Sequence, residues 1–248
     1  MCTVTYIPIN GKVIFSSNRD EDPNRQMAIV PKDYEVNNRK IYYPKDPSGG
    51  GTWIGLNDKG TFAVLLNGGL VNHQKQQHYR HSRGLIVTKM LGDSCPLNYW
   101  RNCDLEGIEP FTLIIYLDNK LYQLLWTGIE KCCFETDPAK AHIWSSSTLY
   151  DLEAKKQRTE LFNHFIQNEI KINRSSLFKF LTCSNKNDLQ NGFIINRNEL
   201  VKTCSISIIE MNNTSALFDY HDLITGTSNS ISLNLLNIPW GKNPATQF

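Results

Sequence analysis

The chain has 248 residues, a length that suits one large domain with a sizeable core, and we expect a single domain over residues 1–248. Its 26 basic and 24 acidic side chains nearly cancel. This balance excludes binding to nucleic acid or to an acidic membrane by charge alone. No stretch of the sequence approaches the roughly 20 apolar residues of a membrane span, so we expect no integral membrane segment.

The seven cysteines are scattered and offer no CxxC spacing. Such a set is typical of reduced thiols in a cytosolic protein rather than of a disulfide framework or a zinc knuckle. The first residues also lack the basic and apolar regions of a signal peptide, so we expect a cytoplasmic protein. His73, His78 and His81 share one polar loop, but its Gln and Arg residues favour a solvated surface over a metal site. We expect no metal and no cofactor.

The first predicted elements are two short strands at residues 3–9 and 12–17, joined by Asn10-Gly11. This dipeptide suits the positive φ angles of a two-residue hairpin turn. Further strands are predicted at residues 52–56, 61–66, 111–117, 121–126, 131–135, 142–145, 205–211 and 215–221. Residues 72–81 are predicted to form an exposed loop.

Three segments carry apolar residues at helical spacing and are predicted to be helices: residues 82–92, 151–170 and 175–182. The first of them begins at Ser82, which can cap a helix, and is closed by Gly92. Hairpins interrupted by helical blocks predict an α+β domain in which helices cover antiparallel sheets.

Cys2 is the first candidate for chemistry. Removal of Met1, which is expected before a small residue, would leave a thiol and a free α-amine on Cys2. Because an α-amine titrates at about pH 8, it can take the thiol proton and generate a thiolate nucleophile. The alternative is that Cys2 is a small buried residue at the start of a strand.

Four segments in order carry a resemblance: Met1-Cys2-Thr3, Asn18-Arg19-Asp20-Glu21, the GGTWIG sequence at residues 50–55 and Leu66-Asn67-Gly68. They resemble the NRDE family, which is the family of the transport and Golgi organisation protein 2. They are also similar to N-terminal nucleophile hydrolases of the cholylglycine hydrolase and penicillin V acylase type. The resemblance covers roughly the first third of the chain. It implies a four-layer αββα sandwich with two stacked antiparallel sheets.

The resemblance also implies roles for single residues. Cys2 would attack an amide carbonyl, and Arg19 would lower the pKa of its thiol. Either Asp20 or Asp22 would orient the α-amine, and the sequence leaves this choice open. Asn67 would donate to the oxyanion of the intermediate. Without the resemblance, Arg19 and its acidic neighbours could form an ordinary surface ion pair, and Asn67 could be a turn residue.

Two departures count against catalysis. Related hydrolases supply a second asparagine and a late arginine, where this chain has Ser147 and Cys204. Ser147 can still donate one hydrogen bond, and Lys202 could compensate for the missing guanidinium. Trp53 and Ser147 are the expected substrate-binding residues. We therefore expect an N-terminal cysteine amidohydrolase or acyltransferase acting on a small amide, or else a non-catalytic protein that binds a hydrophobic ligand such as haem or an acyl lipid.

Overall fold

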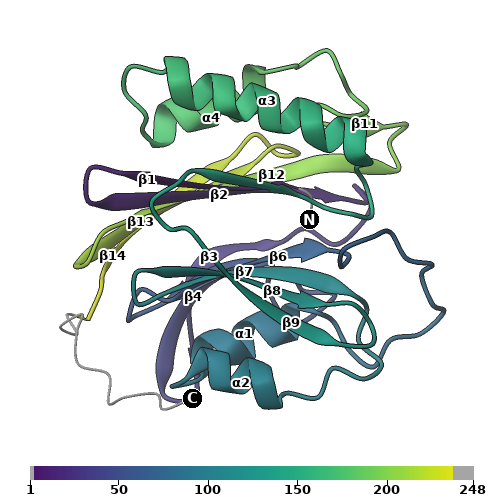
Figure 1. Cartoon of the computed structure of the whole chain (residues 1–248), viewed down its shortest axis with the longest axis vertical. Helices are drawn as coiled ribbons and strands as arrows, with labels where there is room; N and C mark the ends of the chain where they lie inside the picture. Colours follow the sequence, from purple (N-terminus) through teal and green to yellow (C-terminus); the bar gives the residue numbers. More distant parts are fainter. Residues whose placement is uncertain (1–2, 237–248) are drawn as a thin grey trace.

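The computed structural model describes residues 3–236. Two antiparallel sheets are stacked face to face, and each carries two helices on its outer surface (Figure 1). This four-layer arrangement is the predicted αββα sandwich of the α+β class. No helix within the described residues is long and apolar enough to cross a membrane. The six cysteines in this part of the chain are free thiols.

The first sheet runs in the order β10-β1-β2-β12-β13-β14, with β11 paired to β12. Its strands are β1 (Thr3–Ile9), β2 (Lys12–Glu21), β10 (His142–Ser145), β11 (Asn196–Arg197), β12 (Val201–Met211), β13 (Ser215–Asp222) and β14 (Ser228–Asn234). Helices α3 (Leu152–Asn168) and α4 (Arg174–Cys183) cover its outer face.

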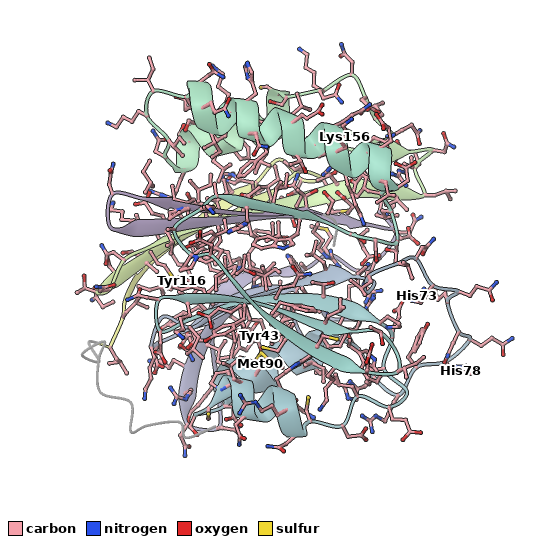
Figure 2. The ribbon with its side chains drawn as sticks, viewed as in Figure 1. Tyr43, His73, His78, Met90, Tyr116 and Lys156 are labelled. Carbon is pink, nitrogen blue, oxygen red and sulfur yellow. The ribbon has the colours of Figure 1, made fainter. Side chains whose placement is uncertain are left out.

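The second sheet runs in chain order from β3 to β9. Its strands are β3 (Ile29–Val36), β4 (Arg39–Lys45), β5 (Ile54–Asn57), β6 (Phe62–Asn67), β7 (Phe111–Leu117), β8 (Lys120–Trp126) and β9 (Lys131–Thr136). Helices α1 (Gly84–Gly92) and α2 (Pro96–Asn102) cover its outer face. Tyr43 and Met90 lie on this helical side of the sheet (Figure 2).

The β1–β2 hairpin turns at Asn10 and Gly11 with φ angles of 48° and 72°, as the sequence predicts. Strand β2, however, continues to Glu21 instead of ending at residue 17. It is a central strand between β1 and β12, and its last residues pair with Lys202 and Thr203. Pairing on β12 therefore extends the strand through Arg19 and Asp20, beyond its apolar run.

Five elements of the described residues were not predicted, namely β3, β4, α2, β11 and β14. The outermost strand β14, with the polar sequence SNSISLN, is held by its ladder with β13 and buries only one side chain, Leu233. Helix α2 has seven residues with Pro96 in its first turn. Segments so short or so polar show little hydrophobic periodicity, and tertiary pairing decides their structure.

Alternation along β2 divides the core into two regions. Phe15 points between the sheets and stacks on Phe62 of the second sheet, with ring centroids 3.8 Å apart. Ile14 points the other way, into a cluster with Phe162 and Phe180 of the helical layer. The same alternation sends successive residues at the end of β2 to opposite faces of the sheet.

Candidate active site

A cavity of 590 Å³ lies beside the end of β2. Arg19 of β2, Trp53 beside β5 and Asn67 of β6 all line it, so three of the predicted site residues share one space. The loop before α1 also contributes to its wall, through His73 and His81 among others. This loop is therefore not simply the solvated surface that the sequence predicts.

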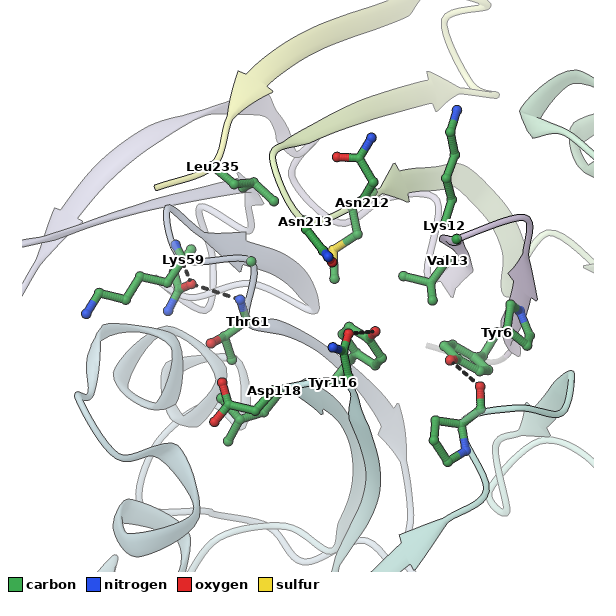
Figure 3. Close-up of a pocket in the computed structure, with 18 of the residues that line it drawn as sticks. Tyr6, Lys12, Val13, Lys59, Thr61, Tyr116, Asp118, Asn212, Asn213 and Leu235 are labelled. Atoms are coloured by element: carbon green, nitrogen blue, oxygen red, sulfur yellow. Dashed lines mark hydrogen bonds between the residues drawn. The ribbon is translucent and has the colours of Figure 1, made fainter. Parts of the chain in front are cut away.

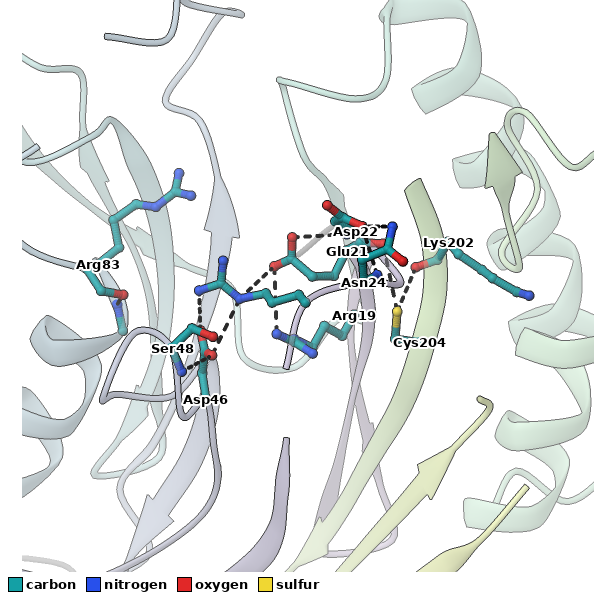
Figure 4. A network of polar contacts seen from close by, with 12 residues as sticks. Arg19, Glu21, Asp22, Asn24, Asp46, Ser48, Arg83, Lys202 and Cys204 are labelled. Carbon is teal, nitrogen blue, oxygen red and sulfur yellow. Dashed lines mark hydrogen bonds and ion pairs between the residues drawn. The ribbon is translucent and has the colours of Figure 1, made fainter. Parts of the chain in front are cut away.

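Arg19 is buried on the face of the first sheet that looks toward the second sheet. Its side chain is 6% exposed, and its nearest carboxylate oxygen belongs to Glu21 at 3.7 Å (Figure 4). The guanidinium carbon lies 4.5 Å from the ring centroid of Trp53. Arg19 thus stacks on an indole inside the protein, which rules out an ordinary surface ion pair.

Asp20 points to the opposite face, toward the helical layer. Its carboxyl group accepts hydrogen bonds from Thr203 Oγ1 at 2.6 Å and from the Tyr150 hydroxyl at 3.1 Å. It is 3% exposed. Because neighbouring residues of a strand alternate in direction, the buried Arg19 and Asp20 lie on opposite sides of β2.

Asp22 lies just after β2 and is exposed. One of its carboxylate oxygens accepts hydrogen bonds from the main-chain N–H of Asn24 at 2.8 Å and from the Asn24 side chain at 3.1 Å. It stabilises the turn that leaves the strand. Of the two acidic candidates, Asp20 is the buried one, and it is held by hydrogen bonds from Thr203 and Tyr150.

Asn67 is the last residue of β6 and pairs with Phe111 of β7. Its main-chain carbonyl accepts from the hydroxyl of Ser146 at 2.7 Å. The following Gly68 has a φ angle of 83°, so the chain turns sharply after the strand. Asn67 lines the cavity, and within residues 3–236 its side-chain amide makes no hydrogen bond.

Of the remaining predicted site residues, Trp53 lines the cavity and Ser147 does not. Trp53 is 3% exposed and forms part of the cavity wall. Ser147 donates its hydroxyl to the carbonyl of Val71 at 3.4 Å, while its neighbours Thr148 and Leu149 line the cavity. Cys2 lies outside the described residues.

Cys204, the residue at the place where the resemblance implies an arginine, lies at an irregularity in the pairing of β12 with β2. Its thiol donates to the carbonyls of Lys202 at 3.3 Å and of Glu21 at 3.8 Å (Figure 4). Burial raises the pKa of this thiol, and the Arg19 charge opposes that rise. Lys202 pairs with Glu199 at 3.7 Å, so its ammonium does not replace a guanidinium at Cys204.

Arg158 of α3 is a buried residue that the sequence analysis missed. It is 1% exposed and donates to the carbonyls of Asn191 and Gly192 and to the hydroxyl of Thr3. Its guanidinium lies 4.1 Å from the ring centroid of Tyr150. Arg158 therefore ties the helical layer to the first described residue of β1. A lone arginine among the charged residues of an amphipathic helix gives no signal of this role.

The loop histidines do not converge. His73 lies 3.4 Å from Glu109, which also pairs with Arg83 at 3.1 Å. His81 contacts the carbonyl of Ser82 at 3.0 Å, and His78 is exposed on the outer side of the loop (Figure 2). Within residues 3–236 no three metal-binding side chains gather into one site.

A larger cavity of 1010 Å³ opens at the opposite end of the inter-sheet space, beside the Asn10-Gly11 turn (Figure 3). Tyr6 and Tyr116 line it and donate their hydroxyls to Pro138 and Asn119, respectively. None of the predicted site residues that the structure describes lines this cavity. The candidate active site is therefore the smaller cavity at Arg19.

The comparisons with solved structures agree with the observed architecture. A variant of conjugated bile acid hydrolase from Clostridium perfringens matches with a TM-score of 0.61 and 11% identity over 93% of this chain and 92% of that chain. The Caenorhabditis elegans orthologue of N-acylethanolamine-hydrolyzing acid amidase matches with a TM-score of 0.56 and 12% identity, over 84% of this chain and 92% of that chain. These likenesses show a shared fold.

Sequence comparisons give the family. No curated protein sequence matches the chain. The family model described as Transport and Golgi organisation 2 matches residues 1–242. This match confirms the resemblance carried by the four N-terminal segments, and the chain belongs to the Transport and Golgi organisation 2 family.

Proposed function

We propose that the protein is a cytoplasmic N-terminal cysteine amidohydrolase or acyltransferase that acts on a small amide. The observation that carries this proposal is the antiparallel register in which Thr3 pairs with Asn18. Arg19 follows Asn18 directly on β2, and it lines the cavity together with Asn67 and Trp53.

In the proposed reaction, the α-amine of Cys2 takes the thiol proton and the thiolate attacks the amide carbonyl. The Arg19 guanidinium stabilises the thiolate, and the Asn67 amide donates to the oxyanion that forms. The α-amine then returns the proton to the leaving amine as the C–N bond breaks, which leaves a thioester. Water, or another acyl acceptor, attacks the thioester and frees Cys2.

Asp20 is the proposed partner of the α-amine. Two hydroxyl donors, from Thr203 and Tyr150, fix its carboxyl group at the end of β2. Asp22 instead stabilises an exposed turn. This difference in surroundings supports Asp20 over Asp22.

A second candidate function is non-catalytic binding of a hydrophobic ligand, such as haem or an acyl lipid. The buried thiol of Cys204 favours it, because this side chain cannot supply the positive charge that the related hydrolases place there. Trp53, Leu65 and Leu149 give the cavity an apolar part of its wall. In this version Cys2 does no chemistry.

The test is to trap the acyl-enzyme. The wild-type protein is incubated with a panel of N-acyl amides and N-acyl amino acids, quenched in acid and examined by intact mass and peptide mapping. We expect an acyl adduct on Cys2 that is absent from Cys2→Ala and present in Cys95→Ala, since Cys95 is exposed and outside the site. Equal turnover by wild type and Cys2→Ala, or the lack of any adduct with a bound substrate, would favour the binding function instead.

A further inference from the structure

Arg158 of α3 holds the first sheet at the start of β1. All three nitrogens of its guanidinium donate hydrogen bonds: Nη2 to the hydroxyl of Thr3, Nε to the hydroxyl of Ser145 at 3.2 Å, and Nη1 to the carbonyls of Asn191 and Gly192 at 2.8 and 2.5 Å. Thr3 and Ser145 are directly opposed residues of β1 and β10. One buried group therefore fixes both strands at the point where the described chain begins.

The same guanidinium packs on the residue that binds Asp20. Its carbon lies 4.1 Å from the ring centroid of Tyr150, and the Tyr150 hydroxyl donates to the Asp20 carboxyl group at 3.1 Å. Arg158 and Tyr150 are 1% and 2% exposed, so this cation–π contact is desolvated. Arg158 therefore helps to set the direction from which Asp20 receives its hydrogen bond.

The partners of Arg158 are unusual for a buried charge. Fully buried arginines are rare unless they are paired, yet within residues 3–236 this guanidinium forms no ion pair. Its acceptors are two hydroxyls and two main-chain carbonyls. A planar fork with donors in fixed directions can hold these four neutral acceptors in place at once, which a lysine cannot do. The group is thus suited to fix positions rather than to neutralise a charge.

Two groups of the proposed reaction depend on what Arg158 holds. Cys2 is bonded to Thr3, so a fixed Thr3 limits the positions open to the nucleophile. Asp20, the proposed partner of the α-amine, accepts from Tyr150. We infer that Arg158 is a positioning residue for the nucleophile, acting through Thr3 and Tyr150. Arg158 does not line the 590 Å³ cavity, so it acts without touching the substrate. The inference rests on the proposed function.

Positioning should show in the ionisation of Cys2. The α-amine can take the thiol proton, and Arg19 can stabilise the thiolate, only while the thiol stays close to both, because charge attraction weakens with distance. A thiol that loses these neighbours should behave as an ordinary one, with a pKa of about 8.5. A loss of stability alone would not move this pKa in the folded protein.

The test is the pH dependence of alkylation by iodoacetamide, read on the peptide that begins at Cys2, well below the melting temperature of every variant. Thr3→Val keeps the shape of the side chain and removes the hydroxyl that accepts from Arg158. We expect alkylation at pH 7 to slow by about tenfold and the midpoint of the pH–rate curve to rise by about one unit. Thr3→Ser, which keeps the hydroxyl, should give the wild-type curve.

Two arginine variants separate positioning from stability. Arg158→Lys keeps the charge but cannot reach all four acceptors, so it should shift the curve in the same direction as Thr3→Val. Arg174, at the start of α4, is the matched control in the same helical layer, because it pairs with Asp219 of β13 and not with β1. Arg174→Met should lower the melting temperature and leave the Cys2 curve unchanged. The exposed Cys95 gives a reference rate in every sample.

Each other outcome overturns a definite claim. A wild-type Cys2 that reacts no faster than Cys95 would overturn the proposed function and this inference with it. A fast wild-type Cys2 whose curve is the same in Thr3→Val would overturn the inference alone and leave Arg158 a purely structural residue. Equal shifts in Thr3→Val and Arg174→Met would do the same, because general loosening of the fold would then explain both.

Discussion

Thr203 of β12 donates its hydroxyl to the carboxyl group of Asp20 on β2 at 2.6 Å, while the same hydroxyl accepts from the main-chain N–H of Ile195 at 2.8 Å. A hydroxyl has one proton to donate, so acceptance from Ile195 directs that proton at Asp20. This chain of two hydrogen bonds joins the segment after α4 to the central strand that also carries Arg19.

Thr203→Val keeps the shape of the side chain and removes both hydrogen bonds. We expect a loss of about 2–3 kcal/mol in the free energy of unfolding, because a charged acceptor and a buried N–H each lose a partner. Urea titration measures it. Thr5→Val, which removes a hydrogen bond between two neutral hydroxyls, should cost about 1 kcal/mol. Equal losses in the two variants would show that the hydrogen bond from Thr203 to Asp20 stabilises the fold no more than a hydrogen bond between two neutral hydroxyls.

The mature protein should begin at Cys2. The small side chain after Met1 favours removal of the initiator residue, and the proposed chemistry needs the free α-amine. Intact mass spectrometry of the purified protein should show the loss of one methionine. A folded preparation that uniformly retains Met1 contradicts this prediction and favours the binding function.

Cys2 should be the most reactive thiol near pH 7. Burial raises the pKa of the Cys103, Cys133 and Cys204 thiols, so less of each is thiolate at neutral pH. A difference of one pKa unit changes the thiolate fraction by about tenfold. Competitive iodoacetamide labelling with peptide mapping ranks the thiols by their labelling rate. Raising the pH toward 9 should bring the labelling rates of the other thiols closer to that of Cys2. Preferential labelling of Cys95 or Cys103 over Cys2 would count against the proposed site.

Asn67 and Arg19 should act with Cys2 as one unit. If an amidase activity is found, Asn67→Ala should lower kcat by about a hundredfold or more, the usual effect of losing one oxyanion donor. Arg19→Lys should also be strongly impaired, because lysine keeps the positive charge but lacks the planar guanidinium that stacks on Trp53. Melting temperatures are measured alongside the steady-state rates. Because Asn67 precedes a turn, this separates a loss of catalysis from a loss of folding. Asn168→Ala, at the exposed end of α3, is the control that should keep full activity.

Arg158 should be a large contributor to stability. Arg158→Met leaves the carbonyls of Asn191 and Gly192 and the hydroxyl of Thr3 without their donor, and we expect a loss of about 3 kcal/mol or more. Chemical denaturation measures it. Lys156→Met, on the exposed side of the same helix, should change stability by about 0.5 kcal/mol or less. A similarly small effect at Arg158 would mean that the helical layer is held by its apolar contacts alone.

Much of the fold follows from local sequence. Asn10-Gly11 sets the first hairpin, since few other residues adopt two successive positive φ angles. Asp151 caps α3 by accepting from the N–H of Ala154 at 2.8 Å, where the sequence predicts that helix to begin. Strands β7 and β10 have the predicted bounds. These features depend on residues close together in the chain, so pattern and propensity suffice.

The site depends on pairing between distant segments. The sequence by itself determined which residues are candidates, because Arg19, Trp53 and Asn67 stand in recognisable motifs. Tertiary structure decided that β2 extends past residue 17, because β12 pairs with its end. That extension puts Arg19 and Asp20 on opposite faces through the alternation of a strand. The buried role of Arg158 likewise comes from packing α3 on the first sheet, where long-range contacts and burial choose the partners.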